Sequence, residues 1–465
     1  MTQNIIQNEK QIITVNQNEE EQLEQNNSNT TQESKKITPN KLVENICFLK
    51  EYVTNFFSNY GFFAIAILLT LYIKYSFLEW QTGDFNGFIK NWYSYFGANN
   101  GFYAFKDSFY DYTPPYLYLL WIGTLGNFEP LYWTKTVSVF FEFVMAFFVA
   151  KIVLLNQTSD SDQVSNQTSN PNFRQIKNLW QYSFVATLLL PTVVMNSSLW
   201  GQCDSIYGSF VVGCLYFLIK KNWLGMTLCF AIGIAIKLQT IFFAPVLLVM
   251  VMVGYLPFRY LVGTGVVTIL IYFLAILPAY LVGRPLLDTA QTRGLLTIYT
   301  SQSNTYKSLT MGSAATMYQW IKDEHYRFFY KAGLGIVSVA TLFIVWLSSN
   351  INPNLKNRLK QGQNTDFIVK TAMLSTILVP FFLPKMHERY FFIADVISVI
   401  YAFYFPKKFW VALAVVSAST FAYFGYLLGT DKLPIYLNPA GLSVIMFFAL
   451  VFVMQDWIKD IFVTK

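Results

Sequence analysis

Apolar runs alternate with short polar breaks along most of the chain. About 20 apolar residues cross the hydrocarbon core of a bilayer, and the runs after about Phe57 approach or reach that length. Residues 1–56 are instead polar and rich in Gln and Asn, which is typical of a disordered tail. We therefore predict an all-α integral membrane protein, with a disordered cytoplasmic tail (1–56) and a polytopic transmembrane domain (57–465). The pattern gives about 12 spans, in a range of about 10–13, at 58–79, 131–155, 180–197, 204–220, 223–236, 238–254, 260–282, 328–348, 370–384, 390–405, 409–428 and 436–457.

Basic residues are clustered in alternate breaks between these runs. Cytoplasmic loops carry an excess of Lys and Arg, so these breaks and both termini are predicted to be cytoplasmic. The clusters are Arg174 with Lys177, Lys220 with Lys221, Arg259, the run Lys356, Arg358 and Lys360, and Lys407 with Lys408. The remaining breaks then lie outside, and they include a large first loop at about 80–130.

One apolar segment inside that first loop does not fit a full span. Residues 114–125 form a stretch of only a dozen residues, which suits a helix lying in the membrane interface. Treating it as a span would reverse the side of every later loop and place the basic clusters outside. We therefore predict that the first extracytoplasmic loop contains interfacial helices.

The composition supports a membrane protein and limits its chemistry. Hydrophobic residues make up 54% of the chain and charged residues 13%, about half the charge that a soluble domain carries. The net charge of +7 is spread over separate clusters, which gives little support to nucleic-acid binding. The four cysteines match neither a disulfide framework nor the spacing of a metal site. Both histidines, His325 and His387, fall in outer segments, so we expect the chemistry on the extracytoplasmic face.

Three outer segments carry candidate functional residues. Asp84 directly precedes an aromatic stretch that is expected to be helical, where it is either an N-cap or a catalytic group. Asp111 precedes two prolines, and a turn explains it as well as a binding role does. Gln202 and Asp204 lie at the boundary of two apolar runs, where an ordinary loop and a polar site are both possible.

The third outer segment, which contains residues 385–389, carries the most specific pattern. Lys385, His387, Glu388 and Arg389 follow one another between two apolar runs, on the face predicted to be outside. Basic side chains at a membrane edge can snorkel or meet lipid headgroups, but this concentration opposes the positive-inside trend. A phosphate-bearing ligand explains it, because Arg and His bind phosphate oxygens. Lys237, at a break between two short spans, is a further candidate for the same site.

Taken in order, these motifs resemble a known family. The motifs are Gly83-Asp84-Phe85 with Trp92, Asp111-Tyr112-Thr113-Pro114-Pro115, Trp200-Gly201-Gln202-Cys203-Asp204-Ser205 and Met386-His387-Glu388-Arg389-Tyr390. They look like those of GT-C superfamily membrane glycosyltransferases, in particular the bacterial polyprenyl-phosphate-sugar-dependent mannosyltransferase-like proteins. The dolichyl-phosphate-glucose glucosyltransferases are more distantly similar. The chain departs from their pattern by an inserted Thr113 and by Arg389 where those enzymes have lysine.

The resemblance implies transfer of a mannose- or glucose-type hexose from a polyprenyl-phosphate donor to an acceptor hydroxyl of a glycan or glycolipid. Asp84 would act as the general base, with inversion at the anomeric carbon. His387, Arg389, Lys237 and Lys385 would bind the donor phosphate, and Asp111, Gln202, Asp204 and Glu388 would bind substrate. A bacterial cytoplasmic membrane is the expected location.

Two further expectations concern metals and an alternative function. Asp84, Asp107 and Asp204 are conceivable metal ligands, but we predict that no metal or other cofactor is required. The competing interpretation is a secondary transporter or a flippase of a lipid-linked sugar, and Lys237 at a helix break is the feature that favours it.

Overall fold

The computed structural model describes residues 39–161, 173–305, 307–363, 365–429 and 438–462. The chain divides into two compact units, Met1–Ile65 and Ala66–Lys465. The described part of the first unit is the start of helix α2 (Pro39–Ser76). Residues 39–56, predicted as part of the disordered tail, are helical here, and residues 1–38 lie outside the described part of the chain. The second unit holds the remaining helices and the candidate residues.

The described residues are helical almost throughout, which confirms the predicted all-α class. Their only bridge pairing is an isolated parallel one between Thr310 and Met386. After α2, the first loop forms η1 (Phe85–Ile89), α3 (Lys90–Ala98), η2 (Gly101–Lys106) and α4 (Pro114–Leu125). Helix α4 covers the dozen apolar residues expected to form a short helix, and two prolines at its start favour helix initiation there.

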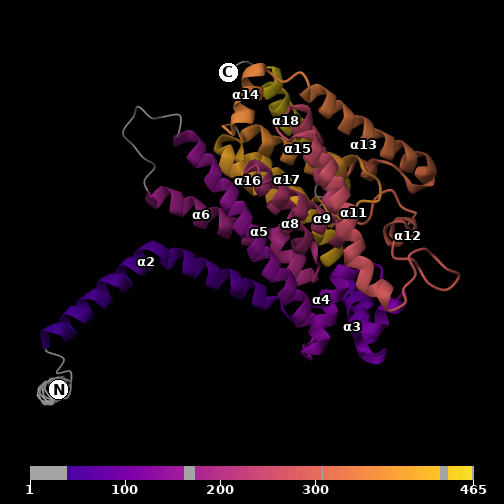
Figure 1. Cartoon of the computed structure of the whole chain (residues 1–465), viewed down its shortest axis with the longest axis horizontal. Helices are drawn as coiled ribbons and strands as arrows, with labels where there is room; N and C mark the ends of the chain where they lie inside the picture. The colour runs from indigo at the N-terminus through magenta and orange to yellow at the C-terminus, as the bar shows by residue number, and fades with distance from the viewer. Residues whose placement is uncertain (1–38, 162–172, 306, 364, 430–437, 463–465) are drawn as a thin grey trace, which may run out of the picture. The chain divides into compact units, whose positions relative to one another are not determined.

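A first group of longer helices follows: α5 (Pro130–Ser161), α6 (Phe173–Leu188), α7 (Pro191–Val194), η3 (Met195–Trp200), α8 (Asp204–Ile219), α9 (Trp223–Ile236), η4 (Leu238–Phe243), α10 (Ala244–Met252) and α11 (Phe258–Leu281). Helix α5 packs against α6 and α8, α8 against α9, and α9 against α11 (Figure 1).

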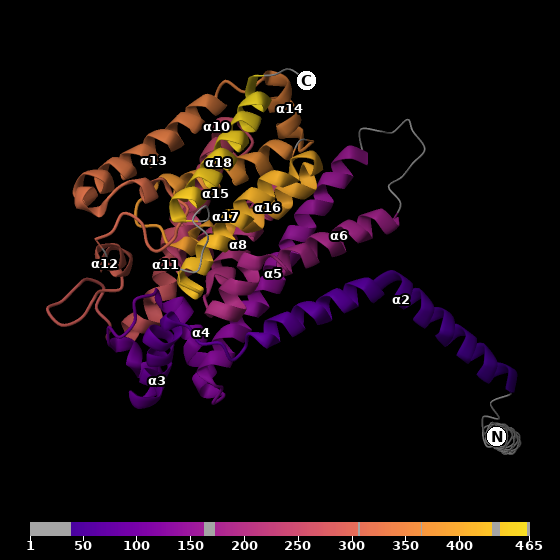
Figure 2. The same cartoon turned by 180° about the vertical axis from the view of Figure 1, so that it is seen from behind.

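The second half of the chain contains α12 (Ile298–Thr305), η5 (Met317–Trp320), η6 (Asp323–His325), α13 (Tyr326–Ser348), α14 (Pro353–Gln361), α15 (Asp366–Phe382), η7 (Glu388–Phe391), α16 (Phe392–Tyr404), η8 (Pro406–Lys408), α17 (Phe409–Leu427) and α18 (Pro439–Phe462). Helices α15 to α18 pack side by side (Figure 2), and α16 joins the two halves by packing against α5. The core is a continuous apolar cluster between these helices.

Five helical segments in the described chain are long and apolar enough to cross a membrane, and two bent pairs raise the number to seven. Helices α11 and α13 expose most of their apolar side chains, with Leu270, Val339 and Trp346 all more than half exposed. Water does not favour such continuous apolar surface, so a lipid environment is the physical interpretation. Several predicted spans, such as 204–220 and 223–236, are helices of only 16 and 14 residues here.

The break between α9 and η4 is built by close packing. Lys237 has an extended backbone, which ends α9, and η4 begins at the next residue. A Cβ at Gly233 would lie 2.8 Å from the hydroxyl of Thr240, so only glycine permits this approach. The break places Lys237 in the wall of a cavity rather than within a continuous helix.

Candidate functional site

A cavity of about 560 Å³ lies between the first loop, the break after α9 and the loop between α15 and α16. Its walls combine apolar and aromatic side chains with a few charged ones, which is typical of a small-molecule site. Eight of the nine residues proposed from the sequence line it: Asp84, Asp111, Gln202, Lys237, Lys385, His387, Glu388 and Arg389. The ninth, Asp204, is fully buried behind the wall, and Asp107 is not among the lining residues.

Asp84 is held by three side chains from two distant parts of the chain. Its Oδ2 accepts hydrogen bonds from Trp200 Nε1 at 3.0 Å and Gln202 Nε2 at 2.7 Å, and its Oδ1 accepts one from the Tyr426 hydroxyl at 3.0 Å. Asp84 precedes η1, but its side chain makes no capping hydrogen bond. Asp84 thus occupies the N-cap position of η1 without capping it through its side chain, because its carboxylate accepts hydrogen bonds from Trp200, Gln202 and Tyr426 instead.

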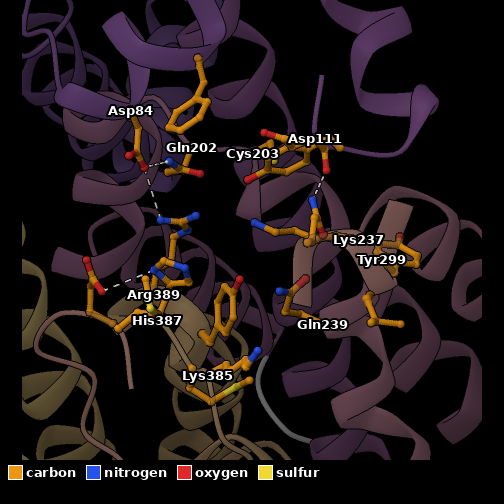
Figure 3. Close-up of a pocket in the computed structure, with 18 of the residues that line it drawn as sticks. Asp84, Asp111, Gln202, Cys203, Lys237, Gln239, Tyr299, Lys385, His387 and Arg389 are labelled. Atoms are coloured by element: carbon orange, nitrogen blue, oxygen red, sulfur yellow. Dashed lines mark hydrogen bonds and ion pairs between the residues drawn. The ribbon is translucent and has the colours of Figure 1, made fainter. Parts of the chain in front are cut away.

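Arg389 connects two acids. Its Nη1 lies 3.4 Å from Asp84 Oδ2 (Figure 3). Its Nε lies 3.7 Å from Asp204 Oδ2. The guanidinium also stands over the ring of Trp200, 5.3 Å from its centroid. Arginine suits this position because its planar fork can address two anions and an aromatic face together.

Asp204 pairs on its other side with Lys237. Asn196 Nδ2 donates to Asp204 Oδ2 at 2.8 Å, and the Lys237 ammonium lies over the rings of Tyr112 and Tyr207. Both charges are almost completely buried, so each needs the other to offset the loss of water. Lys237, proposed as a phosphate ligand, thus has a carboxylate partner within the protein.

We call these four residues, Asp84, Asp204, Lys237 and Arg389, the Asp84 group. Two carboxylates face two cations, so the charges of the group balance before any ligand arrives. An anion that approaches Arg389 must therefore compete with Asp84 or draw on other positive side chains. Such competition would couple the binding of an anion to the freeing of the Asp84 carboxylate.

His387 and Glu388 lie beside this group. Burial lowers the pKa of His387 well below its usual value, and the nearby cations Arg389 and Lys237 lower it further. The imidazole is thus neutral at pH 7, and the 3.8 Å between its Nδ1 and Glu388 Oε2 is not an ion pair. Burial raises the pKa of Glu388, although Arg389 acts in the opposite direction.

Lys385 and Asp111 contact other partners. The Lys385 ammonium lies 4.8 Å from the ring centroid of Tyr330. Asp111 forms an ion pair with Arg293 at 2.5 Å and lies across the cavity from Asp84 in Figure 3. The structure therefore brings Asp84, Gln202, Asp204, Lys237 and Arg389 into direct contact, and leaves Asp111 in a separate part of the same cavity.

Two features that do not belong to the Asp84 group help to hold it in position. The Lys135 ammonium, on α5, donates to the backbone oxygens of Phe77, Leu78 and Trp80, which fixes the chain that leads to Asp84. The π-helix η3 turns Asn196 and its neighbours inward, and π-helical turns occur frequently at functional sites.

Sequence reasoning did not identify Lys135, Tyr426 or the role of Trp200. A lone lysine near the start of the predicted span 131–155 is a signal for Lys135, since ionisable groups in spans usually have a purpose. Tyr426 carries no such signal, because it belongs to a run of apolar and aromatic residues far from Asp84 in sequence.

The site contains no evident metal centre: no three His, Cys, Asp or Glu side chains in the described ranges are grouped so that they could hold a metal ion. Asp107, one of the conceivable ligands, accepts a hydrogen bond from the Tyr95 hydroxyl instead. Comparison of the chain with protein-family models, with curated proteins and with solved structures finds no match in any of the three.

Proposed function

We propose that this protein is a polytopic GT-C-type glycosyltransferase. It would transfer a mannose- or glucose-type hexose from a polyprenyl-phosphate donor to a hydroxyl of a glycan or glycolipid, with inversion. The observation that carries the proposal is the contact between Asp84 and Arg389 inside one cavity. A base and an anion-binding cation side by side match the two needs of the reaction, which are removing a proton and stabilising a phosphate leaving group.

Asp84 is the general base in this scheme. Three donors and Arg389 surround its carboxylate, but Oδ1 accepts only the Tyr426 hydrogen bond in the described chain. A carboxylate oxygen has two lone pairs, so Oδ1 retains capacity for the acceptor hydroxyl. That hydroxyl would give its proton to Asp84 while its oxygen bonds to the anomeric carbon. The bond from this carbon to the phosphate oxygen breaks, and the lipid phosphate leaves with the electron pair.

Arg389 would stabilise the departing phosphate. Its guanidinium would exchange part of its contact with Asp84 for the phosphate oxygens, while Asp204 keeps it in place. His387 and Lys385 line the same cavity and would add a neutral N–H donor and a positive charge. In a cavity with few water molecules such contacts are stronger than in bulk water. The leaving group, polyprenyl phosphate, is a stable monoester anion and needs no general acid.

The proposal includes the membrane arrangement expected from the sequence. The shorter apolar helices would complete about twelve passes, with both termini in the cytoplasm and the cavity on the extracytoplasmic face, as the basic loops indicate. A donor with a polyprenyl tail would reach the cavity laterally from the lipid.

The direct test uses purified protein with polyprenyl-phosphate glucose and polyprenyl-phosphate mannose, each with a labelled hexose. Mixed glycans and glycolipids serve as acceptors, and the released polyprenyl phosphate and the labelled product are measured. Release that depends on Asp84 is the expected result. The proposal fails if well-folded protein releases no polyprenyl phosphate from either donor above the rate of the Asp84→Asn variant.

One observation favours transport as a second candidate. The helix break at Lys237, with its buried pair to Asp204, resembles the discontinuous helices that carry charged groups in transporters. Proteoliposomes containing a labelled lipid-linked sugar distinguish the two functions. Movement of the intact molecule between leaflets, without release of polyprenyl phosphate, would establish transport.

A further inference from the structure

Glu388 has an unusual position in the cavity wall. Its side chain is only 3% exposed, and Oε2 has no hydrogen-bond partner within the part of the chain that the structure describes. Leaving a buried polar atom unpaired costs about 1–3 kcal/mol, so such atoms are rare in stable folds. Because Glu388 lines the cavity, the missing partner has a place to bind.

Gly312 packs directly against the Glu388 carboxyl group. Gly312 has a φ of +56°, and a Cβ there would lie 2.8 Å from Oε2 of Glu388. The loop containing Gly312 is tied to the chain before Glu388, since Met311 N donates to Met386 O at 2.9 Å and Lys385 N donates to Leu309 O at 2.7 Å. The carboxyl group and the backbone beside it are thus held together as one wall of the cavity.

A second buried acceptor faces the same cavity. Oε1 of Gln239 has no hydrogen-bond partner among the described residues, and Gln239 is also a lining residue. Two acceptors without partners, in a cavity with aromatic walls, fit a ligand that carries several hydroxyl groups. A purely apolar ligand would leave both acceptors unpaired.

Glu388 lies where the sugar ring of such a ligand would be. It directly follows His387 and precedes Arg389, and its carboxyl group is close enough to Asp84 for that charge to raise its pKa. In the proposed reaction the phosphate lies at His387 and Arg389, and the attacked carbon lies next to Asp84. The hexose ring connects these two points.

We infer that Glu388, held in the cavity wall against Gly312, binds a hydroxyl of the donor hexose and thereby determines which hexose is transferred. This inference rests on the proposed function and adds the residue that selects the sugar. A buried group built to pair with a hydroxyl discriminates strongly against a ligand lacking it, because its own polar atom is then left without a partner. In a transferase this makes Glu388 a specificity-determining residue rather than the base.

The test compares wild type, Glu388→Gln and Glu388→Ala. Each is assayed for kcat/KM with the polyprenyl-phosphate hexose that wild type uses best and with its 2-, 3-, 4- and 6-deoxy analogues. We expect wild type to lose about 10- to 100-fold on one particular analogue. In Glu388→Ala that loss should shrink to within about threefold, because the partner of the missing hydroxyl is gone. Glu388→Gln should keep part of the discrimination.

Gly312→Ala provides a second, independent variant. The added methyl group should push the Glu388 carboxyl away and reduce the same discrimination. In the double variant Glu388→Ala with Gly312→Ala, the clash is absent, so the two effects should not add. The control is Glu324→Ala, which removes a carboxylate at an exposed position and should leave all donor preferences unchanged.

Three results would overturn the inference. One is an equal loss on every donor in Glu388→Ala, which would indicate a structural role. Another is unchanged discrimination in the same variant. The third is the absence of transfer by wild type with any polyprenyl-phosphate hexose, which contradicts the proposed function itself and removes the basis of this assignment.

Discussion

Two groups of buried charges lie toward opposite ends of helix α15, and they differ in how completely their atoms are paired. The chain leaving α15 carries His387, Glu388 and Arg389 into the cavity. Near the start of the same helix, Lys370 joins a set that we call the α18 ionic cluster, made of Lys370, Lys408, Asp456, Asp460 and Tyr401. The part of α15 between Lys370 and the C-terminal end of the helix is roughly 18 Å long.

The α18 ionic cluster is closed by its own contacts. Lys370 Nζ lies 2.7 Å from Asp460 and 3.3 Å from Asp456, Lys408 Nζ lies 2.5 Å from Asp456, and the Tyr401 hydroxyl donates to Asp456 at 2.9 Å. These contacts join α15, α16, η8 and α18. At the cavity, by contrast, Glu388 and Gln239 keep buried oxygen atoms without partners in the described residues. Buried charge alone is therefore weak support for a functional site. Buried polar atoms without partners that face a cavity are stronger support.

The largest expected difference between the two regions comes from removing one carboxylate in each. Asp84→Asn removes the proposed base and should lower kcat for transfer about 10²- to 10⁴-fold, with little change in the unfolding midpoint. Asp456→Asn, the matched change in the α18 ionic cluster, should cost up to about 3 kcal/mol of stability and leave kcat per folded molecule within about twofold. Transfer assays and thermal unfolding measure both. Undiminished transfer by Asp84→Asn would remove the base assignment.

The next effect concerns the cations. Arg389→Ala should reduce kcat/KM for the donor about 10²- to 10³-fold, because charge stabilisation of the leaving phosphate is lost. Arg389→Lys keeps the charge but not the fork that reaches both Asp84 and Asp204, so it should recover only part of the loss. Lys408→Ala is the control, and it should lower the unfolding midpoint while donor kcat/KM stays unchanged. Equal effects of Arg389→Ala and Lys408→Ala on kcat/KM would erase the distinction between the two regions.

A smaller effect is expected at Tyr426. Tyr426→Phe removes the hydrogen bond to Asp84 Oδ1 and the one that the hydroxyl accepts from the Asp84 backbone N–H, while the ring can remain stacked on Trp200. The loss of one or two hydrogen bonds corresponds to about a 2- to 15-fold decrease in kcat. Tyr401→Phe, the matched loss of a hydroxyl at Asp456, should not change kcat. A decrease that appears in donor KM alone would contradict a role in orienting the base.

The smallest predicted effect is a pH dependence that should be nearly absent. The pKa of His387 lies well below its usual value, so the imidazole protonates only below the physiological range and stays neutral from pH 6 to 8. A phosphodiester donor does not titrate there either. Donor KM in wild type should thus vary less than about threefold between pH 6 and 8, and His387→Ala should raise KM by a constant factor across this range. A wild-type KM that falls steeply from pH 8 to pH 6 would show instead that His387 binds as a cation.

The sequence by itself determined the class of the protein. The length of the apolar runs and the scarcity of charge specify a helical membrane protein, because only lipid can cover that much apolar surface and only helices satisfy their own backbone there. The same local signals predicted helix α4 and drew attention to Asp84, Gln202, Asp204 and the segment Lys385–Arg389. Each is a polar interruption of an apolar pattern, which is visible without knowledge of the fold.

The tertiary structure alone decided which of these residues meet. Tyr426 and Asp84 are 342 positions apart, and no local pattern connects them. The sequence also could not show whether the Asp84 side chain caps a helix or faces the cavity, since both roles place an acid before a helix. Nor could it foresee that Lys237 pairs with Asp204 or that Glu388 keeps an unpaired oxygen. Local pattern records which side chains are polar, whereas long-range packing determines whether their partners come from the protein or must come from a ligand.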